Sequence, residues 1–240
     1  NSPKEKPQQG THESLFCARP GLDVWKASAW AESKDYYNPK EVMEAARLML
    51  SVADRYKGNN NFEYDLVDVL RQAITEKGRL VLKVVSAAYK AEDQGLFAQA
   101  SQRFLNLILL QDELLGTRKE FRVGNWTGMA RNIGQTKEEK DLYEWNARVQ
   151  ITTWGNHSAS ERGKLHDYAH KEWNGILKDF YYMRWKTYFD GLTRSLKGEM
   201  VPVIDWYALE EPWTKVSDTY SSQPEGNCIE VAKRVYQEIF

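Results

Sequence analysis

The chain has 240 residues and a formal net charge of −1, which is enough sequence for one large domain with a sizeable core. This balance of charges gives no broad attraction to nucleic acid or to an anionic membrane surface. No stretch approaches the roughly 18 consecutive apolar residues of a transmembrane helix. We therefore expect no nucleic-acid partner and no membrane insertion.

Residues 1–15 are rich in polar side chains, proline and charge, and they predict a linker rather than a folded element. The chain begins with Asn1 and shows no signal-peptide pattern, so we expect a piece of a longer protein whose compartment is not directly readable. Cys17 and Cys228 are the only two cysteines. They make no disulfide framework, and the sequence leaves open whether they pair.

Helical signals dominate after residue 38. Asn38 and Pro39 are typical of a helix start, because Asn caps the free amides and Pro suits the first turn. Apolar side chains recur about every 3.6 residues between residues 62 and 88, which predicts a long amphipathic helix. A third helix is predicted over residues 94–115, with its apolar residues on one face.

Two later segments match the capping-box pattern, in which Ser or Thr is followed three residues later by Glu. Thr136-Lys-Glu-Glu139 predicts a helix of about 14 residues, and Ser158-Ala-Ser-Glu161 predicts one of about 30 residues. A last helix is predicted over residues 226–239. Val201-Pro-Val-Ile204 is the best strand candidate, although its proline weakens it. The sum predicts an all-α fold, an irregular bundle of about six to eight helices in a single domain.

Aromatic side chains are concentrated between residues 143 and 189. Sugars stack their C–H faces on aromatic rings, so this region is compatible with carbohydrate binding. For most of these rings, packing in the core is the stronger expectation. Trp154 differs because it adjoins Gly155 at a predicted helix end, where a side chain can point into a cleft.

Arg148 has two interpretations. Its position six residues before Trp154 is compatible with a place at the same site. The alternative is a structural ion pair with Glu138, Glu139 or Glu144, since the Arg fork commonly bridges helices.

His166 and His170 lie four residues apart, a spacing that zinc sites use on a helix. The sequence offers no clear third ligand, so core or solvated histidines are the stronger interpretation, and no metal or cofactor is predicted. No pair of carboxylates stands out as an acid/base couple, and there is no phosphate-cradling glycine loop or nucleophile elbow. No catalytic residue is predicted in this chain.

A series of motifs, taken together, resembles the C-terminal all-α domain of the α-N-acetylglucosaminidases, which are the family 89 glycoside hydrolases. The resemblance extends from residue 13 to the C-terminus and assigns residues 16–240 to that domain. The motifs are Ala18-Arg19-Pro20-Gly-Leu22, Ala27-Ser-Ala-Trp30, Tyr64 to Gln72, Gly124-Asn-Trp126, Asp141 to Arg148, Thr153-Trp154-Gly155, Asp167-Tyr168-Ala169, Gln223-Pro224 and Val231-Ala232-Lys233.

In that family a small α/β domain and a (β/α)₈ barrel precede the helical domain. The resemblance implies a retaining mechanism with two glutamates on the barrel, neither of which has a counterpart here. We therefore expect the isolated chain to be inactive. The implied partners are a catalytic barrel of the same parent chain and a glycan ending in α-linked N-acetylglucosamine. The implied parent protein is secreted, periplasmic or lysosomal.

The resemblance implies that Trp30 and Trp154 line the sugar pocket, with Tyr64 as a weaker candidate. Asn146 and Arg148 complete the substrate-binding set. We expect the two tryptophan rings to be partly exposed and within roughly 15 Å of each other, about the span of a small sugar pocket.

The loop at 156–163 is longer and more polar than is usual in the family, so fine substrate preference stays open. The natural glycan, the oligomeric state and the roles of the two histidines also stay open. Two alternative functions remain: an autonomous carbohydrate-binding module and a purely structural buttress for the barrel.

Overall fold

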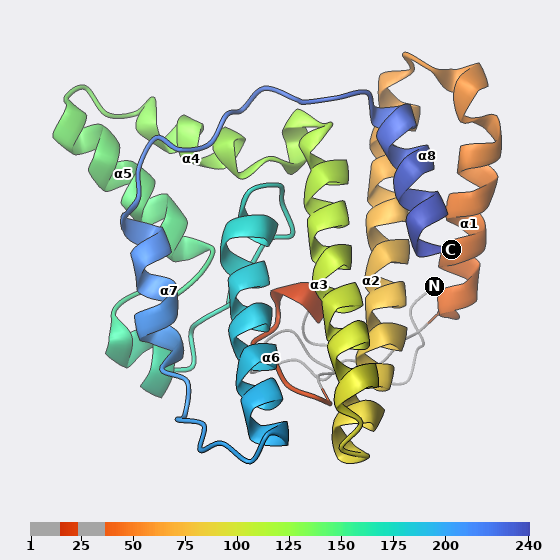
Figure 1. Ribbon diagram of the computed structural model, residues 1–240. Helices are drawn as coiled ribbons and strands as arrows, with labels where there is room; N and C mark the ends of the chain where they lie inside the picture. The colour runs from red at the N-terminus through yellow and green to blue at the C-terminus, as the bar shows by residue number, and fades with distance from the viewer. Residues whose placement is uncertain (1–14, 24–36) are drawn as a thin grey trace, which may run out of the picture.

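The computed structural model describes residues 15–23 and 37–240. Within these ranges the chain is all-α, with eight α-helices and no β-strand (Figure 1). The prediction of an irregular helical bundle in one domain is confirmed. None of the described helices has the length and the hydropathy of a membrane span. The helices are α1 (Pro39–Val52), α2 (Asn60–Lys90), α3 (Gln94–Gly116), α4 (Val123–Arg131), α5 (Lys137–Gln150), α6 (Tyr182–Leu196), α7 (Trp206–Lys215) and α8 (Cys228–Ile239).

The helix starts follow the capping chemistry of the sequence. The Asn38 side chain accepts a hydrogen bond from the Lys40 amide at the start of α1. At the start of α5 both halves of the predicted capping box form, because Thr136 accepts from the Glu139 amide and Glu139 accepts from the Thr136 amide. Each such cap satisfies amides that the first helical turn leaves without a partner.

The long helices form the main bundle. Helix α2 packs against α3, α6 packs on α3 at one side, and α1 and α8 cover α2 at the other side (Figure 1). The apolar stripe that predicts α2 is the face buried between these helices. Large buried side chains of this core include Leu66, Leu70 and Ile74 of α2, Phe97, Phe104 and Ile108 of α3, and Trp185 of α6.

The short helical turn η1 (Leu15–Cys17) inserts the N-terminal segment into this core. The ring of Phe16 lies edge-on to Phe104, with 5.3 Å between the ring centroids. The backbone carbonyl of Phe16 accepts a hydrogen bond of 3.0 Å from the Trp185 indole. A side chain at Gly78 would lie 2.7 Å from the tip of the Phe16 ring, so the glycine makes room for the insertion.

A second group of helices, α4, α5 and α7, lies beside the main bundle (Figure 1). Helix α5 packs against both α4 and α7. The segment 216–227 then leads from α7 to α8 past the start of α4. Arg122 fastens this segment by donating to the Ser221 carbonyl and to the Glu225 carboxylate, at 3.0 and 2.7 Å.

The prediction of a helix of about 30 residues starting at Ser158 is wrong. The chain makes one helical turn at Ser158–Arg162, runs irregularly to residue 176, and makes a second turn at Leu177–Tyr181 that leads into α6. Lys164 and Asp167 have positive φ angles, which are incompatible with a right-handed helix. Glu161 does not close a capping box, because its carboxylate binds Arg19 instead.

Two short helices, α4 and α7, were not predicted. Helix α4 contains two glycines and α7 contains Pro212, residues that disfavour helix in a sequence-based prediction. The Asp205 side chain caps α7 by accepting from the Ala208 amide. The candidate strand at residues 201–204 is wrong as well, because this segment is irregular and leads directly into α7.

Candidate functional site

Trp154 lies where the chain leaves α5. Its amide donates a hydrogen bond of 2.8 Å to the Val149 carbonyl, which turns the backbone back on the last turn of the helix. The φ angle of Trp154 is +61°, in the left-handed region that a large L-residue rarely adopts. The side chain is half-buried. An unfavourable backbone that positions a large ring is typical of functional sites.

Tyr168 lies beside Trp154. The two ring centroids are 4.7 Å apart and the planes are inclined by 53°, with 54 % of Tyr168 exposed. The Asp167-Tyr168-Ala169 motif is part of the family resemblance, but Tyr168 was not selected for the site, because most rings between residues 143 and 189 were expected to pack in the core. The neighbouring Asp167 has a positive φ of +60°, which no sequence pattern indicated.

A hydrogen bond closes the loop that carries the ring pair. The Asp167 amide donates to the Thr152 carbonyl at 2.9 Å, so the residues just before Trp154 and Tyr168 are held together. The Asp167 carboxylate accepts from both terminal nitrogens of Arg184, at 2.9 and 3.1 Å. Both side chains are almost fully buried. This pairing ties the irregular loop to α6 and to the core.

Glu210 of α7 and Arg19 extend the pairing into a chain of charges. The Glu210 carboxylate lies 2.9 Å from the Arg184 Nε and accepts from Arg19 at 3.0 and 3.1 Å. Glu161 accepts from Arg19 at 2.6 and 2.8 Å. The hydrogen bonds from Arg19 lower the pKa of Glu161 to about 2. These contacts join the N-terminal segment, α6 and α7 to the loop that carries the ring pair.

Arg148 is a structural residue in this fold. It is fully buried and donates to Glu144 at 2.6 and 2.8 Å, which is one of the ion pairs considered from the sequence. It also donates to the Trp213 carbonyl, and its guanidinium lies over the Trp213 ring at 4.7 Å. The side chain joins α5 to α7 and is turned away from solvent. The structure does not place Arg148 on an exposed site surface.

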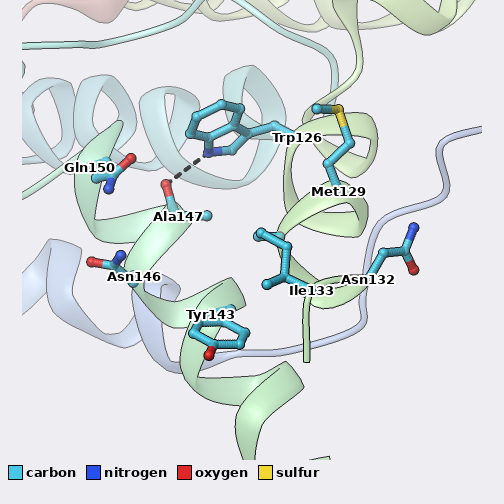
Figure 2. A pocket seen from close by; sticks show the side chains of 9 residues that line it. Trp126, Met129, Asn132, Ile133, Tyr143, Asn146, Ala147 and Gln150 are labelled. Carbon is cyan, nitrogen blue, oxygen red and sulfur yellow. Dashed lines mark hydrogen bonds between the residues drawn. The ribbon is translucent and has the colours of Figure 1, made fainter. Parts of the chain in front are cut away.

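Asn146 is exposed and lines a cavity of about 500 Å³ between α4 and α5, rather than the Trp154 turn (Figure 2). Trp126 donates its indole N–H to the Ala147 carbonyl across this cavity, at 2.9 Å. The remaining lining is mostly apolar. The residues around the cavity are Trp126, Met129, Ala130, Asn132, Ile133, Tyr143, Asn146, Ala147 and Gln150.

Tyr64 and Trp30 are the remaining candidates for the sugar-binding site. Tyr64 is 37 % exposed on α2, and its ring stacks on Phe121 with 4.9 Å between centroids. Trp30 lies outside the described residues, so its expected proximity to Trp154 stays a prediction.

The histidines and cysteines hold local structure. His166 contacts the Ser160 carbonyl at 2.9 Å, and His170 is buried with its Nδ1 against the Asp167 carbonyl. They do not share a helix face, because their segment is irregular. No cluster of three potential metal ligands occurs in residues 15–23 and 37–240. Cys17 and Cys228 are buried and are not joined by a disulfide.

Comparison with known proteins adds a second line of evidence. Residues 2–238 match the family described as the alpha-N-acetylglucosaminidase (NAGLU) C-terminal domain. The human alpha-N-acetylglucosaminidase is 29% identical over 239 residues, which are 97% of this chain and 30% of the human protein.

Solved structures of a family 89 glycoside hydrolase from Clostridium perfringens share the fold. The complex with PUGNAc is 34% identical with a TM-score of 0.91, and the match covers 97% of this chain and 27% of that one. A complex with GlcNAc-alpha-1,4-galactose, its substrate, is 35% identical with a TM-score of 0.89, covering 94% and 26%. The chain thus spans less than a third of the length of these relatives.

Proposed function

This chain belongs to the family of α-N-acetylglucosaminidase C-terminal domains, and from that membership we propose that it forms one wall of the sugar-binding cleft of a retaining α-N-acetylglucosaminidase. The other wall belongs to a catalytic barrel of the same parent protein, which supplies both carboxylates. Residues 16–240 form the domain, together with Leu15, which is buried in η1. The isolated chain is inactive on N-acetyl-α-glucosaminides.

The observation that carries this proposal is the ring pair formed by the half-buried Trp154 and the exposed Tyr168. Sugar rings stack on aromatic faces, and an aromatic pair that is held rigidly loses little freedom on binding. The positive φ angles of Trp154 and Asp167, together with the pairing of Asp167 and Arg184, fix the loop from both sides. A connecting loop needs neither a strained backbone nor a buried ion pair, whereas a binding surface needs its side chains held in one position.

Trp30 and Tyr64 stay in the proposed site as secondary candidates. Tyr64 offers an exposed edge on α2, whereas the ring pair is the central element. Asn146 is assigned to the neighbouring cavity, and Arg148 supports α5 from within. The ligand is a glycan that ends in α-linked N-acetylglucosamine, by analogy with the compounds bound to the solved relatives.

The test is the substitution Trp154→Ala in the parent protein, compared with Trp154→Phe. Loss of a stacking platform should lower kcat/KM for a chromogenic α-N-acetylglucosaminide by about 10- to 100-fold, equal to roughly 1 to 3 kcal/mol. The Phe variant retains an aromatic face and should recover much of the activity. Trp145→Ala, which removes an exposed ring of α5 away from the Trp154 turn, is the matched control.

Two outcomes would favour other functions. A purely structural buttress predicts that Trp154→Ala lowers stability while kcat/KM of the folded fraction is unchanged. An autonomous carbohydrate-binding module predicts that the isolated chain binds N-acetylglucosamine at micromolar to millimolar concentration in calorimetry, whereas half of a cleft should bind weakly or not at all.

A further inference from the structure

The cavity between α4 and α5 is an apolar surface that the helical bundle itself leaves uncovered. Met129 and Ile133 at one side are 59% and 67% exposed, and Tyr143 of α5 faces them across the cavity (Figure 2). We call this surface, with Trp126 at one end, the α4–α5 groove. Exposed apolar side chains gathered around a hollow mark a site of contact with another surface.

The chemistry of the groove favours protein side chains over a sugar. Its strongest donor, the Trp126 indole N–H, is already used by the Ala147 carbonyl at 2.9 Å. Asn132, Asn146 and Gln150 place their amides at the edge, so the groove has an apolar centre and a polar rim. That arrangement is the usual anatomy of a protein–protein interface.

The groove is continuous with the proposed sugar-binding wall. The ring of Trp126 lies 6.3 Å from that of Trp173, which follows Tyr168 on the same irregular segment. At the same end the groove includes Gln150, the last residue of α5, which comes just before the turn that presents Trp154. The groove and the ring pair therefore border one another through both α5 and the loop.

We propose that the α4–α5 groove is the seat of the catalytic domain of the same parent protein, whose apolar side chains fill it. This inference takes its partner from the proposed function. The relatives are more than three times as long as the part that this chain matches, so a large body of protein accompanies this fold in them. Where that body closes the sugar cleft against Trp154 and Tyr168, the adjoining groove must face it too.

A second apolar surface provides the contrast. Leu80, Val84 and Leu96 are about half-exposed between α2 and α3, around a cavity of about 400 Å³. Lys77 and Arg103 line this second cavity, and burial together with Arg103 lowers the pKa of Lys77. This surface is formed by α2 and α3, whereas the ring pair follows α5. It therefore serves as the control surface.

Two exposed methionines, Met129 and Met200, give a direct test by oxidative footprinting, because oxidation of Met depends on exposure. Met129 lies in the groove, and Met200 is 92% exposed between α6 and α7. Dilute hydrogen peroxide is applied to the isolated chain and to the parent protein, and sulfoxide formation is followed by mass spectrometry. In the parent, Met129 should react at least about tenfold more slowly than in the isolated chain, while Met200 changes little.

Substitutions then connect the protection to the groove. Ile133→Asp in the parent should restore most of the Met129 reactivity, whereas Leu80→Asp on the control surface should leave Met129 protected. Both positions are at least half-exposed in the isolated chain, so each variant should keep the far-UV spectrum and the Tm of that chain.

Equal reactivity of Met129 in the isolated chain and the parent overturns the inference, as does equal protection of Met129 and Met200. Protection that rises with the concentration of the isolated chain would assign the groove to a second copy instead, and also overturns it. The proposed function is judged separately, by the effect of Trp154→Ala on turnover, so Met129 can be unprotected while the sugar-binding role survives.

Discussion

The main bundle and the α4–α5–α7 side of the molecule are stabilised in different ways. Helices α2, α3 and α6 meet through apolar and aromatic side chains, of which Phe104 and Trp185 have ring centroids 4.5 Å apart. Around α5 and the loop that follows it, the buried interior contains Glu144, Arg148 and Arg184. Non-directional packing suffices to build a scaffold, but a loop that departs from the helix needs directional partners to hold one conformation.

The charged side has two separate networks. In one, Glu144 accepts from Arg148 of the same helix and from Arg131 of α4, and its second oxygen also accepts from the Asp218 amide at 2.8 Å. In the other, Asp167 and Arg184 hold the loop of the ring pair. The first network joins the helices of the side group, and the second joins the loop to the main bundle.

The largest effect is expected in the main bundle. Trp185→Ala should lower the free energy of unfolding by about 4 kcal/mol, because it removes a fully buried ring and leaves a cavity beside Phe104. Urea unfolding of the isolated chain measures this change. Trp185→Phe is the control, since it keeps a ring and loses the hydrogen bond to Phe16, and it should cost markedly less. Similar costs for both variants would show that the indole hydrogen bond, rather than packing, dominates.

A smaller but still large effect is expected from the charged side. Glu144→Gln should lower the free energy of unfolding by about 3 kcal/mol, because it leaves Arg148 buried without its carboxylate and weakens the contact with Arg131. The exposed residue Glu138 of the same helix provides the control, and Glu138→Gln should change stability by less than about 0.5 kcal/mol. Equal effects of the two substitutions would contradict the role given to the buried network.

The comparison also explains which parts of the fold were predictable. The period of apolar residues and the caps at Asn38 and Thr136 indicate α1, α2 and α5 because these signals are local. The segment after Ser158 carries a local helix signal too, yet its partners lie far away in the chain: Glu161 binds Arg19 and Asp167 binds Arg184. Long-range ion pairs outweigh local propensity there, and a single sequence does not contain them.

The sequence likewise indicated only part of the candidate site. Trp154 was selected for its place at a helix end, and the structure shows it half-buried there with a positive φ. Arg148 was ambiguous from the sequence, because a buried ion pair and a binding contact need the same guanidinium. Tyr168 was missed for the site because it was grouped with rings expected to pack in the core, whereas 54 % of it is exposed on an irregular segment that the residue types alone do not reveal.

Asp112 of α3 joins the two regions and makes their junction sensitive to pH. Its carboxylate accepts from the Gly175 amide at 2.6 Å and from the Lys178 amide at 3.1 Å, and so caps the turn that leads into α6. Burial raises the pKa of Asp112 to about 6, against an ordinary value of 3.8, in spite of these hydrogen bonds. The folded protein therefore binds this proton more tightly than the unfolded chain does.

The sign of the pH dependence follows from that difference. The contribution of Asp112 to stability is fully present below about pH 4 and is lost as the pH rises through about 6, a change of roughly 2 to 3 kcal/mol. The free energy of unfolding, measured at intervals from pH 4 to pH 7, should lose this component in Asp112→Asn and keep it in Glu113→Gln, which alters the exposed neighbour. Parallel profiles for wild type and Asp112→Asn would contradict the assignment.

The smallest effect concerns the turn that presents the ring. Trp154 has a φ of +61°, so the two truncations Trp154→Gly and Trp154→Ala remove the same contact with Tyr168 but differ in backbone strain. Glycine adopts this conformation without a clash, whereas alanine retains a Cβ that opposes it. The Gly variant should therefore be more stable than the Ala variant by about 1 kcal/mol in urea unfolding.

At the exposed helical position Asn146 the order should reverse, with Ala more stable than Gly by about 1 kcal/mol. If Ala is the more stable residue at both positions, the turn relaxes once the indole is gone, and the left-handed backbone is then maintained by the ring contact with Tyr168 rather than by the hydrogen bonds to Val149 and Thr152.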